Sequence, residues 1–149
     1  AQGVAIARGC PAVAVPSILA VAPAMDGHDC LAIGDARRGT FWTARIRGQR
    51  LMDAPALCGE SGLRDAVRAA LGDGSHVFSF EETARFPLPD GELAQVAVLR
   101  PDAARLWQAW RAADDEQRFA WSCEAPQPIY LKPPHITTAV PRTPAVRGT

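Results

Sequence analysis

The stretch of sequence that decides the fold is CLAIGDARRGTFWTARIR, residues 30–47. Its first part, residues 30–36, is nearly all apolar, which is typical of a central strand covered on both faces. Arg37-Arg38-Gly39 predicts a tight hairpin turn, with Gly39 in the left-handed conformation that glycine adopts without steric cost. Residues 40–47 then alternate between the two faces of a half-buried antiparallel strand. The stretch therefore predicts a β-hairpin built on a buried strand.

Outward from this hairpin, the sequence predicts a third strand and then a helix. Gly48-Gln49 turns the chain again into a strand at 50–53, and Pro55 is expected to end this antiparallel meander. Leu63, Val67 and Leu71, spaced at four, predict a helix over 61–71 that Gly72-Asp73-Gly74 ends. Before the hairpin, we expect a helix end at 1–8 closed by Gly9, a buried strand at 12–15, and a short helix from Ile18 that Ser17 caps and Pro23 ends early. After the helix at 61–71, we expect strands at 76–80 and 95–100, separated by a loop at 81–92. A helix at 101–114 with an apolar stripe of Ala103, Leu106, Trp107 and Trp110 follows, and then an extended segment at 129–132.

This order predicts a mixed α/β layer fold, an antiparallel meander with flanking helices, over residues 1–132. A proline-rich tail follows at 133–149. The opening residues predict a helix already under way, as expected of a cut inside a larger fold.

Composition excludes several classes of protein. The 149 residues are 48% hydrophobic and 21% charged, as in a soluble globular protein. Acidic and basic residues number 16 each, without the positive excess of a strong nucleic-acid binder. No stretch has the pattern of a secretory signal or the length of a membrane span, so the cytoplasm is expected. The cysteines form no CxxC pair or disulfide pattern and are expected to be buried free thiols: Cys10, Cys30, Cys58 and Cys123.

No catalytic constellation can be recognised in the chain. His28, His76 and His135 form no metal-binding pair of known spacing. Asp35 ends a buried strand, where active-site acids often lie, but its expected role is to accept hydrogen bonds from the following turn. Arg37 and Arg38 are the best exposed candidates for a contact with phosphate or a partner protein, weighed against a merely solvated turn. Other motifs have simpler interpretations: Gly72-Asp73-Gly74 as a turn, Trp107 and Trp110 as core, and Asp114-Asp115-Glu116 as a solvated helix end.

Four segments, in order, resemble the TsaB (YeaZ) family. The strongest matches are AIGDARRGTFW at 32–42 and PIYLKPP at 128–134 followed by Ile136-Thr137; the weaker ones are the helix-strand-helix passage at 3–20 and the turn at 72–74. This family has the actin-like ATPase (ASKHA, ribonuclease H-like) fold. The resemblance implies that residues 1–132 are its C-terminal lobe, with the N-terminal lobe absent.

The family supplies a scaffold and dimerisation subunit, without catalytic activity of its own, to the complex that makes N6-threonylcarbamoyladenosine in tRNA. The resemblance therefore implies a TsaD-like catalytic partner, a TsaE-like ATPase, possible homodimers and tRNA reached only through the complex. It implies no catalytic residue, no metal ligand, no cofactor and no tight ATP binding. The residues of this sequence that carry the family motifs are Asp35, Gly39, Trp42, Gly72, Asp73, Gly74, Tyr130 and Leu131. Two alternatives stay open, namely a metal-dependent peptidase of the glycoprotease type and a stand-alone nucleotide-binding domain.

Overall fold

A single mixed sheet with helices around it makes up the structure, a computed structural model that describes residues 2–123 and 125–131. The strands are β1 (Cys30–Asp35), β2 (Phe41–Arg47), β3 (Arg50–Leu51), β4 (Ala56–Cys58), β5 (His76–Ser79) and β6 (Val96–Val98). The helices are α1 (Gln2–Arg8), α2 (Ala22–Met25), α3 (Glu60–Gly72), α4 (Asp90–Leu93), α5 (Ala103–Ala112) and α6 (Asp115–Cys123), with 3-10 turns η1 (Ser17–Leu19) and η2 (Thr83–Arg85). The mixed α/β class expected from the sequence is confirmed.

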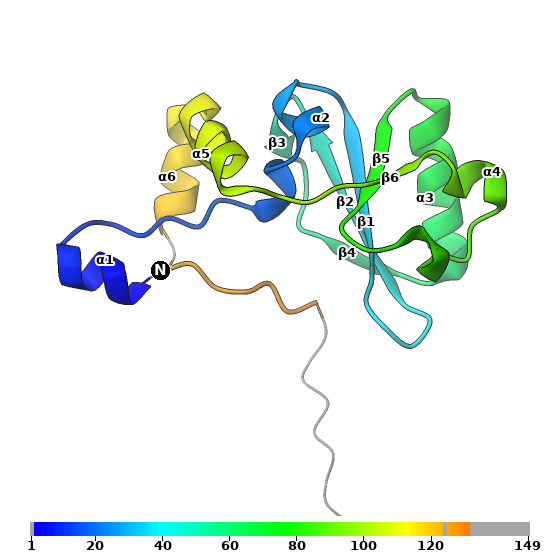
Figure 1. The fold of residues 1–149 in the computed structure, drawn as a ribbon, viewed down its shortest axis with the longest axis horizontal. Helices are drawn as coiled ribbons and strands as arrows, with labels where there is room; N and C mark the ends of the chain where they lie inside the picture. Colours follow the sequence, from blue (N-terminus) through cyan, green and yellow to red (C-terminus); the bar gives the residue numbers. More distant parts are fainter. Residues whose placement is uncertain (1, 124, 132–149) are drawn as a thin grey trace, which may run out of the picture.

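β1 lies at the centre of the sheet, whose order is β3-β2-β1-β5-β6 (Figure 1). β2 runs antiparallel to β1 and pairs Phe41 with Asp35, so the predicted hairpin is present. β5 runs parallel to β1, and β6 runs parallel to β5. The predicted meander therefore forms only part of the sheet, and β5 and β6 extend it with parallel strands reached through helical crossovers.

The helix α3 covers one face of the sheet, and α2, η1 and α5 cover the other (Figure 1). Successive side chains of β1 alternate between these layers: Leu31 and Ile33 face α3, whereas Cys30 and Ala32 face the opposite layer. The α3 layer is completed by Phe41, Leu63, Val67, Ala70, Val77, Phe86, Leu88 and Val96, and the opposite layer by Ile18, Leu19, Val21, Ala24, Ala44, Ile46, Phe78 and Ala109. Burial on both faces explains why β1 is apolar from Cys30 to Gly34, before Asp35 ends the strand.

Gly34 is required by the close packing of Trp42. The two residues are directly paired across β1 and β2. A Cβ atom added at Gly34 would overlap the Trp42 indole ring. The indole packs against the core layer that contains Ala32 and Ala44. The ring therefore occupies the space that any side chain on residue 34 would need.

The predicted helix at the start is present as α1, with Gly9 after it at a φ of 61°, but the segment between α1 and β1 differs from the expectation. Residues 12–15 form no strand, although the Ala14 amide donates to the Trp121 carbonyl at 2.9 Å. A short apolar run without periodicity does not distinguish a strand from an irregular segment packed on the core. Ser17 makes no capping hydrogen bond, and Pro23 lies in the first turn of α2 instead of ending a helix. Proline is favoured there because its missing amide has no helical partner in any case.

Pro55 does not end the meander. β4 follows it and pairs with β2, with Ala56 opposite Thr43 and Cys58 opposite Phe41. Pro55 lies one residue before this edge strand, where its missing amide costs no ladder hydrogen bond. The predicted loop at 81–92 also contains η2 and the start of α4.

The helix predicted at 101–114 is present as α5, and a second helix that the sequence did not predict, α6, follows it. α5 ends at Ala112, and Asp114 begins α6 by accepting a hydrogen bond from the Gln117 amide at 2.9 Å. The acids at 114–116 thus stabilise a helix start, where the dipole favours them, and do not mark a helix end. Ala109 and not Trp107 faces the core, since Trp107 is 60% exposed. Residues 129–131 form no strand, and the tail at 133–149 lies outside the described residues.

Replacing Gly34 with alanine is expected to lower the free energy of unfolding by about 1–3 kcal/mol, because the Trp42 ring must leave its site. Urea denaturation followed by tryptophan fluorescence would measure the change. Gly91→Ala is the matched control, because its Cβ meets no atom within 4 Å, and it should not lower stability. Gly34→Ala combined with Trp42→Leu should recover part of the loss. Equal stabilities for Gly34→Ala and Gly91→Ala would contradict this account of the packing.

Candidate functional site at the arginine hairpin

The turn between β1 and β2 has an unusual backbone. Arg37, Arg38 and Gly39 have φ angles of 69°, 58° and 68°. The Ala36 amide donates to the Thr40 carbonyl at 2.9 Å, which closes the loop. Gly39 adopts the predicted left-handed conformation, but two arginines share it. Left-handed backbone at a residue other than glycine is unfavourable, so the surrounding contacts must hold this turn.

Asp35 supplies the contacts that hold the turn. Its carboxylate accepts a hydrogen bond from the Arg37 amide at 2.6 Å and forms an ion pair with Arg37 Nη1 at 3.3 Å. Arg85 Nη1, from η2, lies 3.7 Å from the same carboxylate. The Asp35 side chain is 16% exposed, so these contacts are screened less than those of a surface pair. As expected from the sequence, Asp35 accepts hydrogen bonds from the turn that follows it.

The carboxyl end of β5 lies next to the hairpin because β1 and β5 are parallel neighbours, with Ile33 opposite Ser79. The buried Ser79 hydroxyl accepts a hydrogen bond from the Glu81 amide at 3.0 Å. The Glu81 carboxylate in turn accepts one from the Asp35 amide at 3.4 Å. In open α/β sheets, ligands bind beyond the carboxyl ends of parallel strands. Two acids and three arginines thus gather at the end of the sheet that is favoured for binding.

Arg38 differs from the other arginines of this cluster. It lies at the exposed tip of the turn, and within residues 2–123 and 125–131 its side chain makes no hydrogen bond or ion pair. Arg37 and Arg85 both contact Asp35. The guanidinium of Arg38 is therefore the one most available for an external phosphate or carboxylate.

The other motif residues do not join this cluster. Gly72-Asp73-Gly74 ends α3, where Gly74 has a φ of 76° and the Asp73 amide donates to the Ala69 carbonyl at 3.0 Å. This turn precedes β5 and so lies at the opposite end of the sheet from the hairpin. Tyr130 is 82% exposed in an irregular segment, and Leu131 follows it. Trp42 packs beside the hairpin against Gly34.

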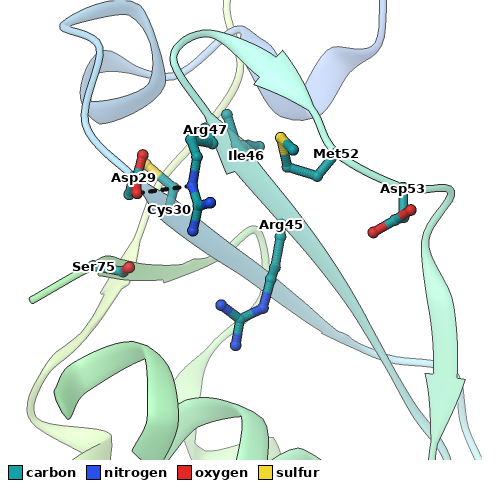
Figure 2. Close-up of a pocket in the computed structure, with 8 residues that line it drawn as sticks. All are labelled: Asp29, Cys30, Arg45, Ile46, Arg47, Met52, Asp53 and Ser75. Atoms are coloured by element: carbon teal, nitrogen blue, oxygen red, sulfur yellow. Dashed lines mark hydrogen bonds and ion pairs between the residues drawn. The ribbon is translucent and has the colours of Figure 1, made fainter. Parts of the chain in front are cut away.

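A cavity of about 210 Å³ lies at that opposite end of the sheet (Figure 2). Asp29 and Cys30 line it from the start of β1, and Ser75 lines it from the residue before β5. The other lining residues come from β2 and the segment after β3: Arg45, Ile46, Arg47, Met52 and Asp53. Sequence reasoning missed this cavity, although strand alternation already placed Arg45 and Arg47 on one face.

His28 and His76 lie together next to this end of the sheet, with ring centroids 4.6 Å apart. They are distant in sequence, and parallel pairing of Cys30 with His76 brings their rings together. In the described part of the chain, no three His, Cys, Asp or Glu side chains are grouped so as to hold a metal ion. His135 lies outside the described residues.

Comparisons with known proteins found no family model, no curated protein and no solved structure that matches this chain. Among the described helices, none combines the length and apolar character that crossing a bilayer requires.

The four thiols are free, but only Cys30 is buried. Burial, and to a lesser degree the neighbouring Asp29 carboxylate, raises the pKa of Cys30 to about 11. Burial also raises the pKa of the half-buried Cys58. Cys10 and Cys123 are exposed, which contradicts the expectation that all four cysteines are buried. Both lie near the ends of helices outside the sheet, and no core layer covers them.

Replacing Asp35 with alanine is expected to lower the free energy of unfolding by about 1–3 kcal/mol, because it removes a charged acceptor from a turn of unfavourable backbone. Urea denaturation would measure the loss. Asp73→Ala is the control, because that exposed side chain makes no hydrogen bond within the described residues, and it should change stability by less than about 0.5 kcal/mol. An Asp35→Ala variant as stable as the Asp73→Ala variant would show that the turn does not depend on the contacts of Asp35.

Alkylation by iodoacetamide should distinguish the thiols, because the thiolate is the reacting form and must be accessible. In the folded protein at mildly alkaline pH, Cys10 and Cys123 should react first and Cys58 more slowly. Cys30 should react only after unfolding in urea. Peptide mass spectrometry at successive times would give the order. Alkylation of Cys30 at the rate of Cys10 would contradict the burial described for β1.

Proposed function

We propose that this chain is a non-catalytic scaffold module of the TsaB kind, acting with a TsaD-like subunit in the threonylcarbamoylation of tRNA adenosine. The observation that carries the proposal is the segment AIGDARRGTFW at 32–42, the most specific of the resemblances. This segment forms one continuous unit, a buried strand followed by an Asp35-held turn and a returning strand. Its motif residues therefore have structural roles that explain why they occur together.

The proposal includes the C-terminal lobe of an actin-like ATPase as the finer fold assignment. Support comes from the antiparallel meander of β1, β2 and β3 followed by parallel strands reached through helices. The Gly72-Asp73-Gly74 turn between α3 and β5 is also compatible with it. The proposal places the chain in the bacterial cytoplasm and gives it no cofactor of its own.

The arginine hairpin is the proposed contact surface. The contacts of Asp35 with the Arg37 amide and with Arg85 stabilise the conformation of the turn in the free protein. A preorganised loop loses less conformational entropy on binding than a flexible one. Arg38, at the tip, presents its guanidinium to an acidic side chain or a phosphate. In this proposal Arg38 makes the contact, and Arg37 helps to hold the turn through Asp35.

Two measurements test the proposal. The chain, purified with the TsaD-like protein of the same organism, should elute with it as a complex in size-exclusion chromatography. Deletion of the encoding gene should lower the content of threonylcarbamoyladenosine in tRNA digests measured by mass spectrometry. Absence of a complex together with an unchanged nucleoside content would overturn the proposal.

Arg38→Glu should weaken binding to the TsaD-like subunit by roughly tenfold or more, since it places a like charge against an acidic or phosphate-bearing surface. Biolayer interferometry would measure the dissociation constant. Arg100→Glu is the charge-matched control at an exposed position outside the hairpin, and it should leave binding within about twofold. Equal effects of the two variants would show that the hairpin is only a solvated turn.

A further inference from the structure

The cavity between Asp29 and Asp53 carries an inference that does not depend on the proposed function. It lies at the amino ends of β1 and β5, away from the arginine hairpin (Figure 2). Its volume of about 210 Å³ corresponds to about seven water molecules in bulk liquid. A small molecule of several heavy atoms therefore fits within it.

Two arginines face this cavity from one face of β2. Arg47 forms an ion pair through Nε with Asp29 Oδ2 at 3.1 Å, so its charge is already compensated. Arg45, two residues earlier, makes no side-chain hydrogen bond or ion pair in the part of the chain that the structure describes. The cavity therefore holds one compensated guanidinium and one that is available.

Asp53 faces the same cavity from the segment that follows β3, as Figure 2 shows. Its carboxylate likewise makes no hydrogen bond or ion pair with the described residues. The Met52 amide donates to the Arg45 carbonyl at 2.9 Å and thereby ties this segment to β2. The backbone thus fixes the positions from which Arg45 and Asp53 reach into the cavity, and the two opposite charges face it without pairing.

The charges of the cavity decide the kind of ligand. Two arginines and two aspartates cancel, so the cavity offers no net field to a simple anion, and Asp53 would repel one. A molecule that carries both signs meets complementary charges on both sides. The half-buried Ser75 adds a hydrogen-bonding group, and Met52 adds apolar surface. A charged group at each end and an apolar part between them match this lining.

We infer that this cavity is a binding site for a small zwitterion, such as a free α-amino acid. Its carboxylate pairs with the Arg45 guanidinium, which suits a planar carboxylate in a bidentate geometry. Its ammonium pairs with the Asp53 carboxylate. Arg47 and Asp29 hold the floor of the site through their own ion pair.

Nuclear magnetic resonance titration of the full ¹⁵N-labelled chain with glycine, alanine and serine tests the inference. These amino acids should cause saturable shifts of the Arg45, Asp53 and Ser75 amide signals at millimolar concentration. Acetate and methylammonium each carry one of the two charges, and each should bind at least roughly tenfold more weakly. Shifts that follow ionic strength alone, or no saturable shift, would overturn the inference.

Two single variants separate the charges. Arg45→Gln and Asp53→Asn each remove one charge at an exposed position, so both should fold and both should weaken amino-acid binding by roughly tenfold. Arg100→Gln lies outside the cavity and should leave binding unchanged. If Asp53→Asn binds amino acids as well as the parent chain does, and acetate binds equally well, the site is a simple anion site and the zwitterion inference is wrong.

Discussion

The double burial of β1 is the constraint on which the rest of the structure depends. Its backbone pairs on one side with β2 and on the other with β5, and its side chains enter both core layers. A strand in this position has no solvent-exposed face, so the side chains that lie within the core must be apolar. The first polar side chain, Asp35, appears where the strand leaves the core, and there it meets the turn and Arg85. The site at the hairpin is therefore a consequence of where β1 ends.

Local pattern was sufficient for the central part of this fold. The apolar run of β1, the alternation of β2 and the glycine-closed turn each identify their own element, and the spacing of Leu63 and Val67 identifies α3. Residues 12–15 and Trp107 were placed wrongly for another reason. An apolar side chain indicates burial, but only the packing of neighbouring elements decides which side chains are buried. Ala109, a small residue, fits against η1 and the α2 layer where Trp107 would not.

The sequence alone indicated only those residues of the candidate site that are neighbours along the chain. Asp35, Arg37 and Arg38 are adjacent along the chain, so their grouping follows from the hairpin alone. Ser79, Glu81 and Arg85 join them because β5 is parallel to β1, and no local signal indicates which strand will pair there. The same pairing brings His28 to His76 and Asp29 close to Ser75 at the other end of the sheet. Features that depend on long-range pairing lie beyond analysis of single segments.

The mixed sheet also implies an order of folding. The β1–β2 hairpin is closed by a three-residue turn and can form within microseconds, like other short local contacts. The pairing of Cys30 with His76 closes a much longer loop through α3. Closing this loop costs more conformational entropy, and the new contacts offset that cost only after they have formed. During synthesis, β1 therefore emerges after η1 and α2 and pairs with β2 while its other edge and the face that α3 covers are still open. An apolar strand with an open edge is prone to intermolecular pairing, and the arrival of α3 and β5 removes that hazard.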